Sequence, residues 1–222
     1  MFNSMKVVVL SAGTGSRLRP HTIDRPKSMV EFIGRPLIDY QLRVFQKYGL
    51  DEITIVVGHC RDSVTAPNCK LVYNPNFLTT NMVASLFMAE SVFDGQQDVI
   101  VAYGDIVFEE RVIRGLLDSD GAVSVVIDEN WYEYWSTRMS DPLNDVESLV
   151  LSDDRTKILD IGGEIESLSE VEGQYIGLIK IRKVLTISCR MSSLASKSDI
   201  PSALWLKWKS EKIFDFSNRN QT

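Results

Sequence analysis

The sequence VVVLSAGTGSRLRPHTIDRPKSM, residues 7–29, joins a run of β-branched residues to a long loop rich in glycine, arginine and hydroxyl side chains. A short, continuously apolar run such as Met5 to Leu10 is typical of a strand buried on both faces of a parallel sheet. In open α/β sheets, ligands bind in the crevice beyond the carboxyl ends of the strands. The sequence therefore predicts a binding loop at residues 10–32.

The rest of the chain alternates between strand and helix patterns. Its periodicities predict strands at 52–57, 70–73, 98–103 and 122–127, helices at 36–48, 81–93 and 109–117, and a hairpin within 149–162. Strands that alternate with helices of this length require right-handed crossovers between parallel strands. We therefore predict an α/β fold with a doubly wound, mostly parallel, Rossmann-like sheet and a small β-hairpin extension.

Composition excludes several classes of protein. The formal net charge of −6 argues against a nucleic-acid or membrane-surface binder, because such proteins usually carry a basic field. The 3 cysteines show no metal-type pairing and are accompanied by only 2 histidines, which argues against a zinc site and for a reducing, cytoplasmic compartment. No segment has the pattern of a signal peptide or a membrane span.

The loop contains groups suited to phosphate. Gly13 and Gly15 allow the backbone to approach a ligand, and successive amides there can form an anion-binding concavity. Arg17 and Arg19 offer bidentate donors, and Lys27 offers a compact charge. The spacing matches neither a Walker A loop nor a dinucleotide-binding fingerprint. On these residues alone, a glycine turn beside solvated basic side chains is an equally good interpretation.

The complete pattern is more specific than its parts. The stretch LSAGTGSRLRPHTIDRPKSM resembles the signature of the nucleotidyltransferases that make sugar-nucleotides and CDP-alcohols. The matching positions are Ala12, Gly13, Gly15, Ser16, Arg17, Leu18, Pro20, Thr22, Pro26, Lys27 and Met29. The resemblance implies a fold of the nucleotide-diphospho-sugar transferase type. It also implies attack by an acceptor phosphate or phosphonate on the α-phosphorus of a nucleoside triphosphate, with release of pyrophosphate.

The resemblance assigns roles to individual residues. Arg17 would hold the β- and γ-phosphates, Lys27 would bridge the α-phosphate and the acceptor, and Asp105 of YGDIVF would ligate Mg²⁺. The nucleotide-binding set that it implies is Ala12, Gly13, Thr14, Gly15, Ser16, Arg17, Lys27, Asn81 and Ser85. Without the loop, Asp105 would be interpreted as a loop cap. For Asn81 and Ser85, an ordinary helix cap and a serine on a helix surface are equally good interpretations.

Two later segments, 128–151 and 170–181, look most like the phosphocholine cytidylyltransferase branch, which favours CTP; a sugar-1-phosphate nucleotidyltransferase is the alternative. An ammonium group could be bound by cation–π contact with an aromatic cluster of Trp131, Tyr132, Tyr134 and Trp135. Arg138 could instead recognise a carboxylate or the acceptor phosphate. Equally, these aromatic side chains could cap the sheet or line a subunit interface, so a homo-oligomer is compatible with the sequence.

The resemblance ends after residue 181, which divides the chain into a nucleotidyltransferase domain at 1–181 and an atypical basic tail at 182–222. The tail carries 8 Lys/Arg against 3 Asp/Glu and contains no glycine. The second metal-binding aspartate that the family carries is not recognisable, since neither Asp199 nor Asp215 has its context. A truncated or frame-shifted end, which would impair catalysis, explains these features together; a partner-binding tail is the alternative.

Overall fold

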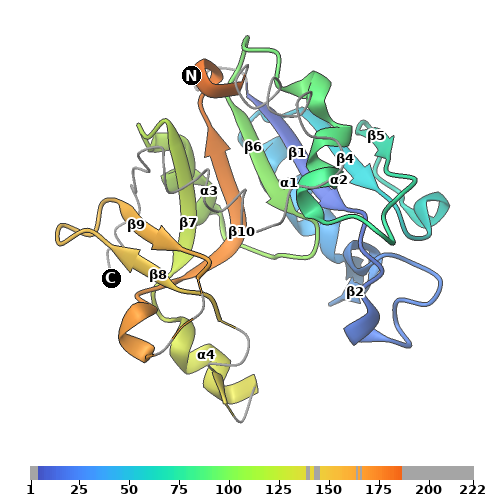
Figure 1. Ribbon diagram of the computed structural model, residues 1–222. Helices are drawn as coiled ribbons and strands as arrows, with labels where there is room; N and C mark the ends of the chain where they lie inside the picture. The colour runs from blue at the N-terminus through green and yellow to red at the C-terminus, as the bar shows by residue number, and fades with distance from the viewer. Residues whose placement is uncertain (1–4, 139–140, 143–145, 164, 166, 187–222) are drawn as a thin grey trace.

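Six strands form the main sheet of the computed structural model, which describes all residues except 1–4, 139–140, 143–145, 164, 166 and 187–222 (Figure 1). Their order is β5-β4-β1-β6-β10-β7. The bounds are β1 Lys6–Ser11, β4 Glu52–Val57, β5 Lys70–Tyr73, β6 Val99–Tyr103, β7 Val123–Asp128 and β10 Gln174–Ile181. β1 pairs in parallel with β4 and β6, and β4 pairs in parallel with β5. The mostly parallel sheet predicted from the sequence is confirmed.

Helices and hairpins connect these strands. The helices are α1 Leu37–Lys47, α2 Met82–Met88, α3 Glu110–Asp118 and α4 Trp131–Arg138. The hairpins pair β2 Glu31–Phe32 with β3 Arg35–Pro36, and β8 Leu149–Leu151 with β9 Ile158–Ile161. The second hairpin lies where the sequence predicted one, whereas β2–β3 and α4 were not predicted.

One predicted helix is shorter in the structure. The helix expected at 81–93 ends at Met88, and a 3₁₀ turn follows at Glu90–Val92, where the Val92 amide donates to the Ala89 carbonyl at 2.9 Å. Val92 and Phe93 are both buried in the core. The tighter turn ends the regular helix while its apolar residues still reach the sheet, which helical periodicity alone does not predict.

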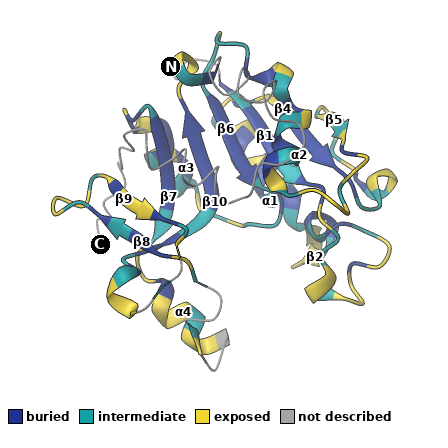
Figure 2. Cartoon of the chain, viewed as in Figure 1, coloured by how far each residue is buried: buried dark blue, intermediate teal, exposed yellow. Residues whose placement is uncertain are grey.

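The core has two halves, one on each face of the sheet. Val7 and Val9 pack with side chains of α1 and α3, whereas Val8, on the opposite face, packs with α2 and the β8–β9 hairpin. Figure 2 shows the central strands dark blue between these layers. Burial on both faces explains why β1 is continuously apolar rather than alternating.

β10 is antiparallel to both of its neighbours, β6 and β7, and it bends between them. Its pairing with β7 is irregular between Tyr175 and Ile179, and Gly177 in this bend has a φ of +91°. A Cβ on Gly177 would lie 2.5 Å from the Tyr103 ring. The absence of a side chain at Gly177 therefore makes room for the ring of Tyr103, the last residue of β6.

The end of the described chain is tied to the sheet domain. The Arg182 amide donates to the Ala122 carbonyl at 3.0 Å, and the Lys183 amide donates to an Asp98 carboxylate oxygen at 2.8 Å. Most of the basic tail, with Asp199 and Asp215, lies outside the described residues. Within the described part of the chain, no helix is both long enough and apolar enough to cross a membrane.

Replacing Gly177 with alanine should destabilise the fold by about 2–5 kcal/mol, because a left-handed φ and a clash with the Tyr103 ring act together. Gly49→Ala is the matched control, since Gly49 has a φ of +72° but open space around its Cβ position. We expect about 1 kcal/mol for this control. Urea unfolding of both variants measures the difference, and equal losses would contradict the steric account.

Candidate functional site

A cavity of ≈ 470 Å³ opens at the carboxyl ends of β1 and β6. Three segments line it: the loop after β1, the start of α2 with the residues before it, and the turn after β6. The lining residues are Leu10, Ser11, Ala12, Gly13, Gly15, Ser16, Arg17, Leu18, Lys27, Ser28, Phe77, Thr80, Asn81, Met82, Ser85, Tyr103, Gly104 and Asp105. This is the location that the parallel topology predicts for a ligand.

The glycine-rich loop is held in a compact shape by a buried threonine. Gly15 has a φ of +60°, and a Cβ there would lie 3.0 Å from the Thr22 methyl group. The Thr22 hydroxyl donates to the Gly15 carbonyl at 2.8 Å, and the side chain of Thr22 is fully buried. His59 Nε2 lies 2.9 Å from the Thr22 carbonyl oxygen, so the loop is also anchored to the segment after β4.

Lys27 is presented to the cavity by a short 3₁₀ turn. The turn spans Lys27–Met29, and Ser28 and Met29 are its buried residues. The Ser28 hydroxyl lies 2.6 Å from the Ser11 hydroxyl at the end of β1. Because the side chains of Ser28 and Met29 are buried, the turn leaves the Lys27 side chain among the residues that line the cavity.

Lys27 and Asp105 form an ion pair across this cavity. Lys27 Nζ lies 2.6 Å from Asp105 Oδ2, and the two side chains are 40% and 31% exposed. The Gly104 amide donates to the Leu10 carbonyl at 2.8 Å, which brings the turn after β6 against the end of β1. Two groups that lie 78 positions apart in the sequence thus meet at hydrogen-bonding distance.

A buried asparagine organises the opposite wall. Asn74 is fully buried, and its Nδ2 donates to the hydroxyls of Thr80 and Ser85, each at 3.0 Å. Asn81 caps α2, since its Oδ1 accepts from the Ala84 amide at 3.0 Å. Asn81 is therefore both a helix cap and a cavity residue. Ser85 is buried, so the interpretation as a serine on a helix surface is wrong.

Tyr103 closes the cavity beside Asp105. Burial, and next the negative charge of Glu147, raise the pKa of the Tyr103 hydroxyl to about 12. Its ring packs edge-on against Tyr175 with the ring centroids 5.5 Å apart. The phenol consequently stays protonated at neutral pH and presents a neutral, aromatic wall.

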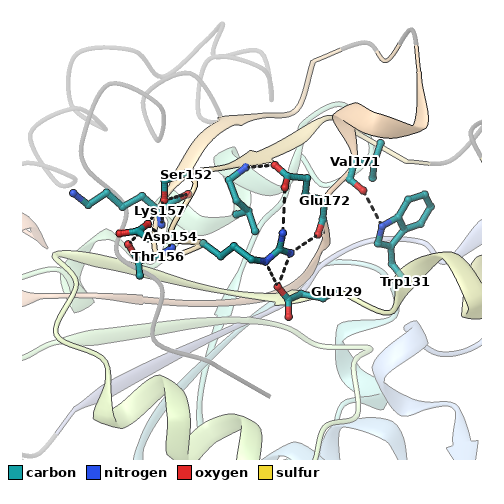
Figure 3. Close-up of polar contacts among 10 residues, drawn as sticks. Glu129, Trp131, Ser152, Asp154, Thr156, Lys157, Val171 and Glu172 are labelled. Carbon is teal, nitrogen blue, oxygen red and sulfur yellow. Dashed lines mark hydrogen bonds and ion pairs between the residues drawn. The ribbon is translucent and has the colours of Figure 1, made fainter. Parts of the chain in front are cut away.

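The aromatic residues of α4 lie away from this cavity. Trp131 is buried, and its indole N–H donates to the Val171 carbonyl at 3.1 Å (Figure 3). Tyr132 and Trp135 pack edge-on against Trp131, with centroid distances of 5.5 and 6.4 Å. Trp131 thus has a packing contact in this structure, as one of the two sequence interpretations expects. Tyr132 is exposed, and the side chain of Arg138 lies outside the described part of the chain.

A charged network holds the start of α4 near the β8–β9 hairpin. Arg155 Nη2 lies 2.7 Å from Glu129, two residues before α4, and Arg155 Nη1 lies 3.2 Å from Glu172. Glu172 also accepts from the Leu151 amide at 2.7 Å, and Ser152, Asp154, Thr156 and Lys157 close the hairpin turn (Figure 3). α4 is therefore positioned by contacts with the β8–β9 hairpin rather than by the glycine-rich loop after β1.

The structure gathers most of the predicted nucleotide-binding residues around one cavity. Ala12, Gly13, Gly15, Ser16, Arg17, Lys27, Asn81, Ser85 and Asp105 line it, whereas Thr14, Trp131, Tyr132 and Trp135 do not. Sequence reasoning did not assign Phe77, Thr80 or Tyr103 to the site. Tyr103 had a usable signal, since it directly precedes the Gly-Asp of the strand-end motif; Phe77 and Thr80 had none beyond their segment.

The chemistry of the cavity is that of an anion site with one carboxylate. Two cationic side chains and the amides of a glycine-rich turn suit phosphate oxygens. Asp105 is the one carboxylate among the lining residues. No cluster of three His, Cys, Asp or Glu side chains that could hold a metal occurs among the residues that the structure describes. A divalent ion held by Asp105 would take its other ligands from water and from a bound phosphate.

Comparison with known proteins identifies similar sequences. The pattern of the MobA-like NTP transferase domain matches residues 7–159. The CTP:phosphoglutamine cytidylyltransferase of Campylobacter jejuni is 34% identical over 185 residues, covering 79% of this chain and 72% of that protein. The CMP-5'-(3-aminopropyl)phosphonate synthase of Streptomyces rubellomurinus is 35% identical over 129 residues, 54% of this chain and 20% of that longer protein.

A solved structure shares the fold. The CTP:phosphocholine cytidylyltransferase from Streptococcus pneumoniae superimposes with a TM-score of 0.73 at 20% sequence identity, covering 99% of this chain and 91% of that one. At this identity the likeness establishes the fold.

Thr22→Val should cost about 1 kcal/mol, because it removes the hydroxyl that donates to the Gly15 carbonyl while keeping the buried shape. Thr79→Val is the control, since the Thr79 hydroxyl makes its bond to the Asn76 carbonyl on the exposed surface. Chemical unfolding measures both. If Thr22→Val and Thr79→Val lower the free energy of unfolding equally, the loop does not depend on this hydrogen bond.

Proposed function

Because the chain belongs to the MobA-like NTP transferase domain family, we propose that it transfers CMP from CTP to a small phosphate- or phosphonate-bearing acceptor, releasing pyrophosphate. That it is a nucleotidyltransferase follows from the family. The observation that carries the finer proposal is the convergence of the glycine-rich loop, Lys27 and Asp105 on one cavity. Relatives whose names specify CTP or a CMP product support CTP as the donor.

The nucleotide would lie across the cavity with its phosphates on the loop. Backbone amides between Gly13 and Ser16, together with Arg17, would receive the β- and γ-phosphates. The base would lie toward Asn81 and Ser85, which line the opposite wall. This orientation would place the α-phosphate between the glycine-rich loop and the opposite wall, beside Lys27.

Among the described residues, the cavity offers one carboxylate ligand for Mg²⁺. Asp105 supplies one hard carboxylate oxygen at the cavity, and Mg²⁺ is commonly held by one or two carboxylates together with substrate phosphates. When bound, the ion would neutralise phosphate charge during the transfer. Lys27 must then leave Asp105, and it would move to the α-phosphate and the incoming acceptor.

Transfer requires charge neutralisation more than proton transfer. An acceptor phosphate oxygen would form a bond to the α-phosphorus while the bond to the bridging oxygen of pyrophosphate breaks. The attacking oxygen is already ionised at neutral pH, so no general base is needed. Lys27, Arg17 and the loop amides would hold the two anions in line and stabilise the developing charge.

The phosphate of the acceptor would lie in the cavity beside Lys27, and its amino-bearing end would extend toward α4, whose aromatic residues do not line the cavity itself. Tyr132 and Trp135 present aromatic rings suited to an ammonium group, with Trp131 as their buried anchor. Arg138 would meet a carboxylate or the acceptor phosphate. A relative whose product carries an aminopropyl phosphonate supports an acceptor of this class.

Pyrophosphate release tests the proposal directly. The four nucleoside triphosphates are assayed with Mg²⁺ against phosphocholine, phosphoethanolamine, aminoethylphosphonate, phosphorylated amino acids and hexose 1-phosphates. We expect turnover with CTP and an amino-bearing acceptor. Turnover with a hexose phosphate alone would overturn the acceptor class. Nucleotide binding without any turnover would instead favour a catalytically impaired relative.

The Lys27–Asp105 pair predicts that substitution of either residue lowers turnover, whereas loss of the carboxylate alone strengthens metal-free CTP binding. Lys27→Met should lower kcat/KM by about 10²–10³-fold, as expected when one preorganised donor is removed. Asp105→Asn should also abolish Mg²⁺-dependent turnover. In EDTA, however, Asp105→Asn should bind CTP more tightly than the wild type, because Lys27 is freed and a nearby negative charge is lost.

Calorimetric titration of CTP with and without Mg²⁺ distinguishes these effects. Lys47→Met is the control, since Lys47 forms an exposed ion pair with Glu110 that is not part of the cavity. Weaker metal-free CTP binding by Asp105→Asn would show that the carboxylate supports the nucleotide site in some other way.

A further inference from the structure

Gln41 is a polar residue in a position that the helix pattern assigns to the core. The buried residues of α1 are Ile38, Gln41, Leu42 and Phe45, and Gln41 is only 1% exposed. Its Oε1 is buried without a hydrogen-bond partner among the described residues. An unpaired buried acceptor is costly, so an apolar side chain would suit simple packing better.

The amide nitrogen of Gln41, in contrast, donates two hydrogen bonds. Gln41 Nε2 donates to the Tyr103 carbonyl at 2.8 Å and to the Ile106 carbonyl at 2.6 Å. These two carbonyls lie on either side of Gly104 and Asp105. One amide group of α1 therefore bridges the turn from which the cavity carboxylate projects.

This turn has few other main-chain contacts. The Gly104 amide donates to the Leu10 carbonyl, and beyond it no backbone–backbone hydrogen bond involves residues 105–107 in the described part of the chain. Ile106 packs against the core on the α1 side of the sheet. Without the Gln41 amide, the turn after Gly104 would rely on side-chain packing and on the Lys27–Asp105 ion pair.

We propose that Gln41 is a positioning residue for Asp105, holding the turn at residues 103–106 so that the carboxylate faces Lys27 and a nucleotide-bound Mg²⁺. The inference rests on the proposed role of Asp105 as a metal ligand. Groups that orient a metal ligand from behind commonly change metal affinity by about 10–100-fold when they are removed. Gln41 reaches Asp105 through the backbone and touches no substrate.

Gln41→Met tests this role, because methionine keeps the length of the side chain but donates no hydrogen bond. Gln46→Met is the matched control, since Gln46 lies on the exposed face of the same helix. Mn²⁺ binding is followed by electron paramagnetic resonance in the presence of CTP. We expect Gln41→Met to weaken Mn²⁺ binding by about tenfold or more. CTP binding in EDTA should not weaken in either variant.

Hydrogen exchange provides a readout that needs neither metal nor turnover. The Gly104 amide, which donates to the Leu10 carbonyl, should exchange faster in Gln41→Met than in the wild type or in Gln46→Met. Wild-type exchange at this turn, or wild-type Mn²⁺ affinity in the folded variant, overturns the proposal. An equal loss of Mn²⁺ binding and of metal-free CTP binding also overturns it, because that is the result of general damage.

Gln41→Glu covers the case in which the methionine variant does not fold. A buried, protonated carboxyl group can donate one of the two hydrogen bonds, so its Mn²⁺ affinity should lie between those of the wild type and Asp105→Asn. Wild-type affinity would overturn the proposal here too. If wild-type metal binding does not depend on Asp105, both the inference and the proposed metal ligand fail. If no acceptor turns over while Gln41→Met still weakens Mn²⁺ binding, the proposed function alone fails.

Discussion

The close approach of backbone at the carboxyl end of β1 is the constraint on which the site depends. The Leu10 carbonyl accepts from the Gly104 amide at 2.8 Å, and the Ala12 carbonyl accepts from the His59 amide at 3.1 Å. A Cβ on Gly58 would lie 2.5 Å from the Ala12 oxygen, and one on Gly104 would lie 3.0 Å from the Leu10 oxygen. Because both neighbours of the loop lack side chains there, three strand ends meet closely enough to form one cavity.

The cavity at these strand ends contains charges of both signs, and two of them form an ion pair. The net charge of the chain is −6, yet the cavity carries two cations and one carboxylate. Lys27 is paired with Asp105 at 2.6 Å, so the positive charge that would receive a phosphate is neutralised by the group that would receive a metal. In the proposed complex, the nucleotide and the metal would compete with this ion pair, and binding of both would replace it by a Lys27–phosphate contact and an Asp105–metal contact.

Much of the fold could be predicted from local pattern. β4 and β5 have the predicted bounds, and the glycine-rich loop follows the predicted first strand. These features succeed because β-branched runs and glycine-containing turns restrict the backbone locally. α4 was not predicted, since Trp131 to Arg138 has no clear apolar face and its position depends on Val171 and Arg155 from elsewhere in the chain.

The sequence by itself determined the class of fold and the loop that carries Arg17 and Lys27, because the motif is contiguous and its chemistry is local. Only the tertiary structure decided that β10 enters antiparallel between β6 and β7, bending at Gly177 around Tyr103. It also decided that Lys27 meets Asp105 and that the Gln41 amide donates to the Tyr103 and Ile106 carbonyls on either side of Asp105. These contacts join residues far apart in the chain, and strand order and helix packing, which no local pattern encodes, bring them together.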